Sequence, residues 1–131
     1  MWRLSKRRHY RWLRLTGHAP DIRLLAKVAR LEKQKETRFL FGLEKSPSIV
    51  TPADAYVLTG IVVAGDEKLI SRKFDLVLPK RDMGDISVND YVALGVMKND
   101  ICIGIEKIPV AEDRAKQIEW VADWRCPGER R

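Results

Sequence analysis

The side chains best suited to metal binding or nucleophilic chemistry in this chain are two histidines and two cysteines, His9, His18, Cys102 and Cys126. Structural zinc sites use four nitrogen or sulfur ligands, usually in close pairs, and these residues form no such pair. A nucleophilic thiol needs a base beside it, and no histidine is close in sequence to either cysteine. Glycine-rich phosphate loops are absent as well. The sequence therefore predicts no catalytic residue, no metal site and no cofactor.

One arrangement of charged residues fits a divalent-metal nuclease in part. In such an enzyme two carboxylates and a lysine surround a metal ion that holds the scissile phosphate and activates water. Asp75 lies in an apolar strand pattern and Lys98 ends the next one, but Val96 stands where the second acid is expected. A metal-dependent nuclease is therefore ranked third among the possible functions, after a nucleic-acid-binding protein and a protein-interaction module.

The positive charge of the chain is concentrated near its start. The 131 residues carry a formal net charge of +7. Residues 1–45 hold 13 Lys or Arg against four Asp or Glu, whereas residues 46–131 hold 12 against 14. An acidic partner should therefore meet the first third of the chain.

This basic third has the composition of a nucleic-acid-binding surface. The planar guanidinium of arginine donates two hydrogen bonds to phosphate oxygens and stacks on bases, and unpaired bases also stack on aromatic rings. Six phosphate contacts from the first segment would make log affinity fall with log salt at a slope of roughly 4 to 5. The predicted contact residues are Arg3, Lys6, Arg7, Arg8, Tyr10, Arg11, Trp12 and Arg14, followed by Arg23, Lys27, Arg30 and Lys33.

The leading hypothesis is a small non-enzymatic protein that binds RNA or DNA, alone or within a nucleoprotein assembly. The alternative is a protein-interaction module, an inhibitor or a structural subunit, whose basic amphipathic helix docks on an acidic partner. Aromatic and arginine side chains dominate such interfaces, so Trp2, Trp12, Trp120 or Trp124 would be buried by that partner. The first residues of the chain carry no acid, which is also typical of a mitochondrial presequence. Their Trp and Leu side chains would suit a membrane surface, which is the least favoured partner.

Apolar spacing predicts the elements that position the basic residues. The arginines of residues 1–15 form one stripe if this segment is helical, although Tyr10 and Trp12 alternate with polar neighbours as in a strand. Apolar residues spaced by three and four predict a second amphipathic helix over residues 21–36. Proline and two serines then mark a linker over residues 44–48.

The second part of the chain has the period of β-strands. Residues 55–65 and 69–78 flank one turn, and residues 90–97 and 101–110 flank another, which predicts two hairpins. Helical spacing returns over residues 111–124. The predicted fold class is α+β, with N-terminal basic helices, a four-stranded antiparallel meander in the form of a curled sheet or small barrel, and a C-terminal helix.

The chain is expected to divide into a basic helical segment, residues 1–45, and a β-sheet segment, residues 46–131, within one compact unit. No apolar run approaches the ~20 residues that span a bilayer, and the basic start lacks the features of a secretory signal. Two cysteines are too few for a disulfide scaffold. We therefore expect an intracellular, reducing compartment, either the cytoplasm or the mitochondrion.

Overall fold

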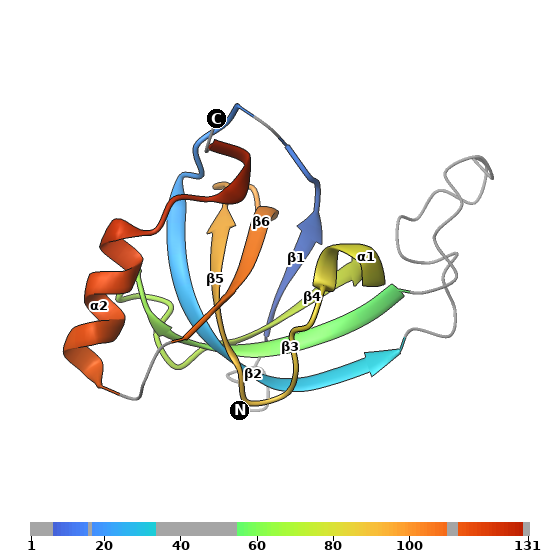
Figure 1. The fold of residues 1–131 in the computed structure, drawn as a ribbon, viewed down its shortest axis with the longest axis horizontal. Helices are drawn as coiled ribbons and strands as arrows, with labels where there is room; N and C mark the ends of the chain where they lie inside the picture. Colours follow the sequence, from blue (N-terminus) through green and yellow to red (C-terminus); the bar gives the residue numbers. More distant parts are fainter. Residues whose placement is uncertain (1–6, 16, 34–54, 110–112, 130–131) are drawn as a thin grey trace.

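The chain folds into a closed barrel of six strands, in the order β1-β4-β3-β2-β5-β6 (Figure 1). The computed structural model describes residues 7–15, 17–33, 55–109 and 113–129. The strands are β1 Arg8–Trp12, β2 Ile22–Lys33, β3 Ala55–Ala64, β4 Lys73–Pro79, β5 Tyr91–Val96 and β6 Ile101–Ile108.

The first strand closes the barrel. β2, β3, β4, β5 and β6 pair with one another antiparallel, whereas β1 is parallel to both of its neighbours. Its first half, from Arg8 to Tyr10, pairs with β4, and its second half, Arg11 and Trp12, pairs with β6. This strand of five residues thus joins β4 to β6, the two edge strands of the sheet that the other five strands form.

The barrel interior is filled by the inward face of each strand. Phe74 is buried and its ring lies 5.3 Å from the ring of Tyr10, centroid to centroid. Gly60 faces the Phe74 ring, and a Cβ at this position would lie 2.6 Å from Cζ of that ring. Met83 and Ile86 pack against the same cluster from the segment that follows β4. This interior removes the apolar side chains of the cluster from water.

A second apolar cluster lies on the outside of the barrel, under the C-terminal segment. Helix α2, Arg114–Asp123, is capped by Asp113, whose carboxylate accepts a hydrogen bond from the amide of Ala115 at 3.0 Å. It packs beside β2 (Figure 1), and the chain continues through Trp124 and Cys126, both buried, into the short helix η3, Pro127–Glu129. Cys126 lies against the glycine pair Gly95 and Gly104 of β5 and β6.

The predicted fold class, with N-terminal basic helices and a four-stranded antiparallel meander, is wrong. The structure is a mixed six-stranded barrel, and the described residues contain only two short α-helices, α1 at Lys80–Met83 and α2. Within the predicted first helix the structure has strand β1, Arg8–Trp12, and residues 22–33 of the predicted second helix are β2. The two hairpins, β3 with β4 and β5 with β6, and the C-terminal helix are confirmed. The predicted linker over residues 44–48 lies outside the described residues. No helix in the described part is long and apolar enough to cross a membrane.

Candidate nucleic-acid interface

The strand conformation of β1 removes the predicted arginine stripe. Side chains alternate along a strand, so Arg7, His9 and Arg11 lie on the outer face while Tyr10 points into the barrel. Arg14 follows the strand near α1. A helix would place these arginines in one stripe, whereas the strand distributes them over both of its faces and both of its ends. Arg3 and Lys6 lie outside the described residues.

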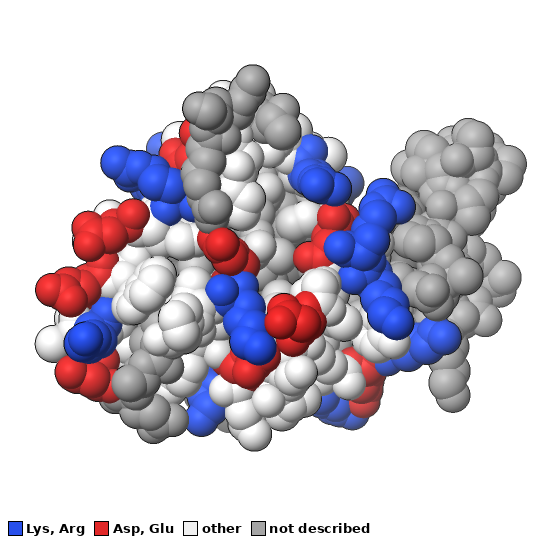
Figure 2. Space-filling model, viewed as in Figure 1, with Lys and Arg blue, Asp and Glu red and all other residues white. Residues whose placement is uncertain are grey.

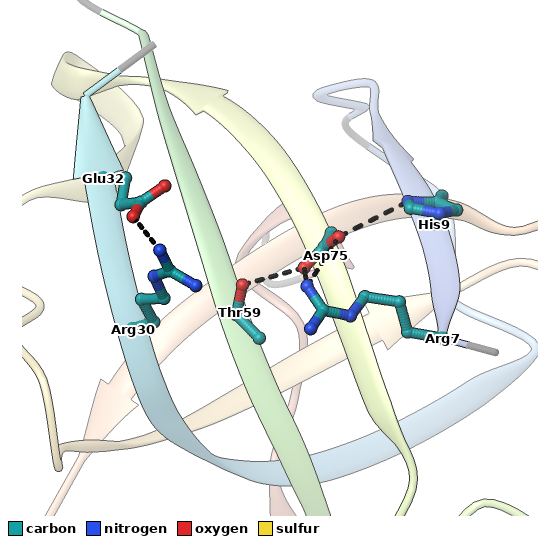
Figure 3. A network of polar contacts seen from close by, with 6 residues as sticks. All are labelled: Arg7, His9, Arg30, Glu32, Thr59 and Asp75. Carbon is teal, nitrogen blue, oxygen red and sulfur yellow. Dashed lines mark hydrogen bonds and ion pairs between the residues drawn. The ribbon is translucent and has the colours of Figure 1, made fainter. Parts of the chain in front are cut away.

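Arg7 is neutralised within the chain (Figure 3). Its Nη1 donates to both carboxylate oxygens of Asp75, at 3.1 and 3.3 Å, and Thr59 Oγ1 donates to the same carboxylate at 2.8 Å. His9 Nδ1 lies 3.6 Å from Oδ2 of Asp75. Asp75 is opposite His9 in the parallel β1–β4 register and opposite Thr59 in the antiparallel β3–β4 register. The carboxylate thereby links three strands on the outer face of the barrel.

Two more arginines of the first segment are paired with aspartates. Arg8 Nη1 donates to Asp100 Oδ1 at 2.9 Å, and Arg14 Nη1 donates to Asp82 Oδ1 at 3.1 Å. The other oxygen of Asp82 accepts a hydrogen bond from the indole of Trp12 at 3.1 Å. Trp12 is thereby held against α1 and is half-buried. These residues fasten the short β1 strand to its surroundings.

The second group of predicted residues lies on β2 and is also engaged. Arg23 Nη2 donates to both oxygens of Glu129, at 3.0 and 2.9 Å. Arg30 pairs with Glu32, as Figure 3 shows, and Lys27 Nζ lies 5.8 Å from the centroid of the Tyr91 ring. Lys33 has a further polar or electrostatic contact. Most of the predicted phosphate ligands thus have partners within the chain.

Tyr10 does not present its ring to solvent. It is 5% exposed and packs on Phe74 inside the barrel. Burial raises the pKa of its phenol to about 12, and the positive charge of Arg8 offsets only part of that rise. Tyr10 is therefore a core residue, and the prediction that its ring stacks on a base does not agree with this position.

A cavity at one end of β1 is lined by cationic side chains. It has a volume of about 590 Å³ and lies between the start of β1, the start of β4 and the β5–β6 turn. Among the described residues that line it, four are cationic and one, Asp100, is a carboxylate. We call it the basic cavity, and its charged lining residues are Arg7, Arg8, Arg72, Lys73 and Asp100.

Three exposed cations near β1 have no carboxylate partner among the described residues, namely Arg11, Arg72 and Lys73. Of these three, only Arg11 is among the contact residues predicted from the sequence, because the predicted contacts all come from the basic residues 1–45. Arg72 and Lys73 directly precede β4, and the parallel pairing of β1 with β4 brings them beside Arg7 and Arg8. That long-range pairing has no local sequence signal.

The surface as a whole carries mixed charge. On the face shown in Figure 2, Lys and Arg side chains are interspersed with Asp and Glu rather than gathered into one field of a single sign. A broad electrostatic footprint of the kind that duplex-binding proteins present is therefore absent from the described residues of this face. The basic cavity is a local concentration of charge.

The acidic and sulfur side chains of the described residues do not come together in one site. In the part of the chain that the structure describes, no group of three His, Cys, Asp or Glu residues converges. Asp75, the carboxylate of the nuclease hypothesis, is engaged by Arg7 and Thr59. Cys102 and Cys126 are both completely buried, and burial raises the pKa of the Cys102 thiol to about 12. Neither sulfur is placed as a nucleophile.

Comparisons of this chain with protein-family models, with curated proteins and with solved structures find no match.

Proposed function

We propose that this chain is a small non-enzymatic nucleic-acid-binding protein that holds phosphate groups at the basic cavity. The observation that carries the proposal is the convergence of Arg7, Arg8, Arg72 and Lys73 on one hollow with a single described carboxylate in its lining. Arg72 and Lys73 have no acidic partner among the described residues, so they can bind a phosphate without breaking an internal ion pair. Cations of this kind bind phosphates by releasing condensed counterions.

The set of phosphate ligands differs from the one that the sequence suggests. Arg7, Arg8 and Arg14 must share their guanidinium groups with Asp75, Asp100 and Asp82. Arg72 and Lys73 are therefore the principal ligands in the basic cavity, and the exposed Arg11 is a third ligand farther along β1. Three contacts account for a salt slope of roughly 2 to 3, from about 0.7–0.9 per contact.

The test is charge reversal within the basic cavity. Arg72→Glu and Lys73→Glu, made singly, should each weaken binding to a mixed panel of labelled RNA and DNA oligonucleotides, measured by fluorescence anisotropy at low salt. All sequences should weaken alike, because phosphate contacts carry little sequence information. Lys116→Glu is the matched control, since Lys116 is exposed on α2 and does not line the cavity.

Two results would contradict the proposal. One is the absence of measurable binding by the parent protein at low salt. The other is an equal loss of affinity for Lys73→Glu and Lys116→Glu, because binding would then depend on net charge and not on the cavity. Circular dichroism spectra of each variant confirm that the barrel remains folded.

A protein partner is the second candidate, and the internal pairing of the arginines favours it. Paired arginines leave less uncompensated charge for a polyanion, and Ile118 on α2 is a large apolar side chain that is 55% exposed. Trp124 is 5% exposed and belongs to the fold, so it is not part of such an interface. Capture from a lysate that survives nuclease treatment and is abolished by Ile118→Asp would favour this candidate.

A further inference from the structure

A second hollow lies on the other side of β1 from the basic cavity. It is a groove of about 370 Å³ with an apolar lining of Trp12, Leu13, Val77 and Ile101. It shares His9 and Tyr10 with the basic cavity, and the carboxylate of Asp75, which is paired with Arg7, also lines it. We call it the apolar groove. The groove exists because β1 leaves β4 after Tyr10 and pairs with β6 from Arg11 onward, so the second halves of β1 and β4 are not hydrogen-bonded to each other.

The apolar groove is open to solvent. Leu13 is 48% exposed, although its backbone amide is fixed by a hydrogen bond to the carbonyl of Cys102 at 3.0 Å. Arg11, an exposed cation, also lines the groove. An apolar surface with Arg11 at its border, next to the basic cavity, matches a ligand that has a flat apolar group attached to a negatively charged backbone.

We propose that β1 is a platform for single-stranded nucleic acid, with phosphates in the basic cavity and an unpaired base in the apolar groove. This inference rests on the proposed function and adds the form of the nucleic acid. Proteins bind single strands by combining a positively charged groove with apolar contacts to exposed bases. A duplex keeps its bases stacked inside and offers only phosphates, so it leaves the apolar groove uncovered.

The experiment compares three probes on the parent protein. They are a labelled 12-nucleotide single strand, its duplex, and a strand of the same length in which abasic sites replace the bases. The single strand should bind more tightly than both, because only this probe places a base in the groove. No change to the protein is involved in this comparison, so the result does not depend on a variant that folds poorly.

Variants then locate the contact. Leu13→Ser should weaken binding to the single strand by roughly three- to tenfold and leave the duplex and abasic probes unchanged, because one apolar contact to a base is lost. Val88→Ser is the control, since Val88 is 45% exposed and does not line the groove. Arg72→Glu should weaken binding to all three probes.

The outcomes separate this inference from the proposed function. Equal affinity of the parent for the single strand and the abasic strand would overturn the single-strand inference, while weakening of both by Arg72→Glu would sustain the phosphate cavity. An unchanged single-strand affinity of Leu13→Ser would likewise remove the groove from the binding site. Absence of binding to every probe would overturn both.

Discussion

The guanidinium of Arg7 lies 3.1 Å from the carboxylate of Asp75, Nη1 to Oδ1, and joins the parallel strands β1 and β4. The sequence assigns these two residues to different functions, Arg7 to phosphate binding and Asp75 to metal-dependent catalysis. In the folded chain each is the partner of the other. The side chain of Asp75 is 16% exposed, and Thr59 donates a further hydrogen bond to it. The pair is therefore best explained as part of the barrel closure.

Removal of the charge of Asp75 should have two measurable effects. Asp75→Asn should lower the free energy of unfolding by about 1 kcal/mol, because a partly exposed ion pair that holds β1 is lost. It should also tighten nucleic-acid binding, since Arg7 becomes available to a phosphate. Urea denaturation and anisotropy measure the two effects.

The control for this substitution is Asp85→Asn, at a side chain that is 87% exposed and 3.8 Å from Lys107. It removes the same charge without touching β1. If Asp75→Asn weakened nucleic-acid binding while the barrel stayed folded, Asp75 would be part of the binding site and the structural explanation would be wrong.

The failure to predict β2 has a specific physical cause. Its residues Leu24, Ala26 and Val28 face the barrel interior, while Leu25 faces the outer cluster under the C-terminal segment. A register shift between Val28 and Arg30 then changes the alternation, so Leu31 packs inward again. Two buried faces and a bulge give an apolar spacing of three and four, which in a linear sequence is typical of a helix.

The hairpins were predictable because their signals are local. β4 alternates regularly between buried and more exposed residues, the apolar run of β3 precedes it, and a turn lies between the two strands. The closure of the barrel by β1 was not predictable, because its pairs join residues more than 60 positions apart in sequence. The basic cavity depends on that closure, so its residues Arg72 and Lys73 were missed.

The C-terminal segment docks on a surface made flat by two glycines, and a methyl group there should disrupt it. A Cβ on Gly104 would lie 2.2 Å from Sγ of Cys126, and one on Gly95 would lie 2.8 Å from the same atom. Gly104→Ala should therefore destabilise the protein by about 1–3 kcal/mol. The measurement is urea denaturation followed by Trp fluorescence, because Trp124 belongs to the docked segment.

A double-mutant cycle attributes this loss to the contact. Cys126→Ala removes the sulfur atom, so Gly104→Ala should cost about 1 kcal/mol less in that background than in the parent. Additive effects would mean that the cost arises from the backbone of β6 and not from the docked segment.

Glu129 should make the stability of the protein depend on pH in the acid range. Burial alone would raise the pKa of its carboxyl, but the hydrogen bond from the amide of Cys126 and the guanidinium of Arg23 outweigh burial and lower the pKa below its ordinary value of 4.5. Between this lowered pKa and about pH 4.5, the folded state therefore binds fewer protons than the unfolded state. The stabilisation is complete above pH 4.5 and is lost as pH falls through the depressed pKa.

Urea midpoints between pH 7 and pH 3 test this dependence. Glu129→Gln should be less stable than the parent at pH 7 and should show a flatter decline on acidification. Glu119→Gln, at an exposed position of α2, should follow the parent curve. Parallel curves for Glu129→Gln and the parent would show that this carboxylate is not linked to folding.

The two cysteines should report separately on the barrel and on the C-terminal segment. Both are completely buried, but Cys102 belongs to the barrel interior and Cys126 to the outer cluster. Detachment of residues 124–129 exposes Cys126 while the barrel stays closed, and local openings of this kind occur at lower free energy than global unfolding. Cys126 should therefore react with a thiol reagent faster than Cys102 in mild denaturant.

The two rates are measured by mass spectrometry on the single-cysteine variants Cys102→Ala and Cys126→Ala. Full denaturation provides the reference at which both thiols react. Equal rates with the same denaturant dependence would mean that the segment and the barrel open as one unit, since each thiol would then be released by the same transition.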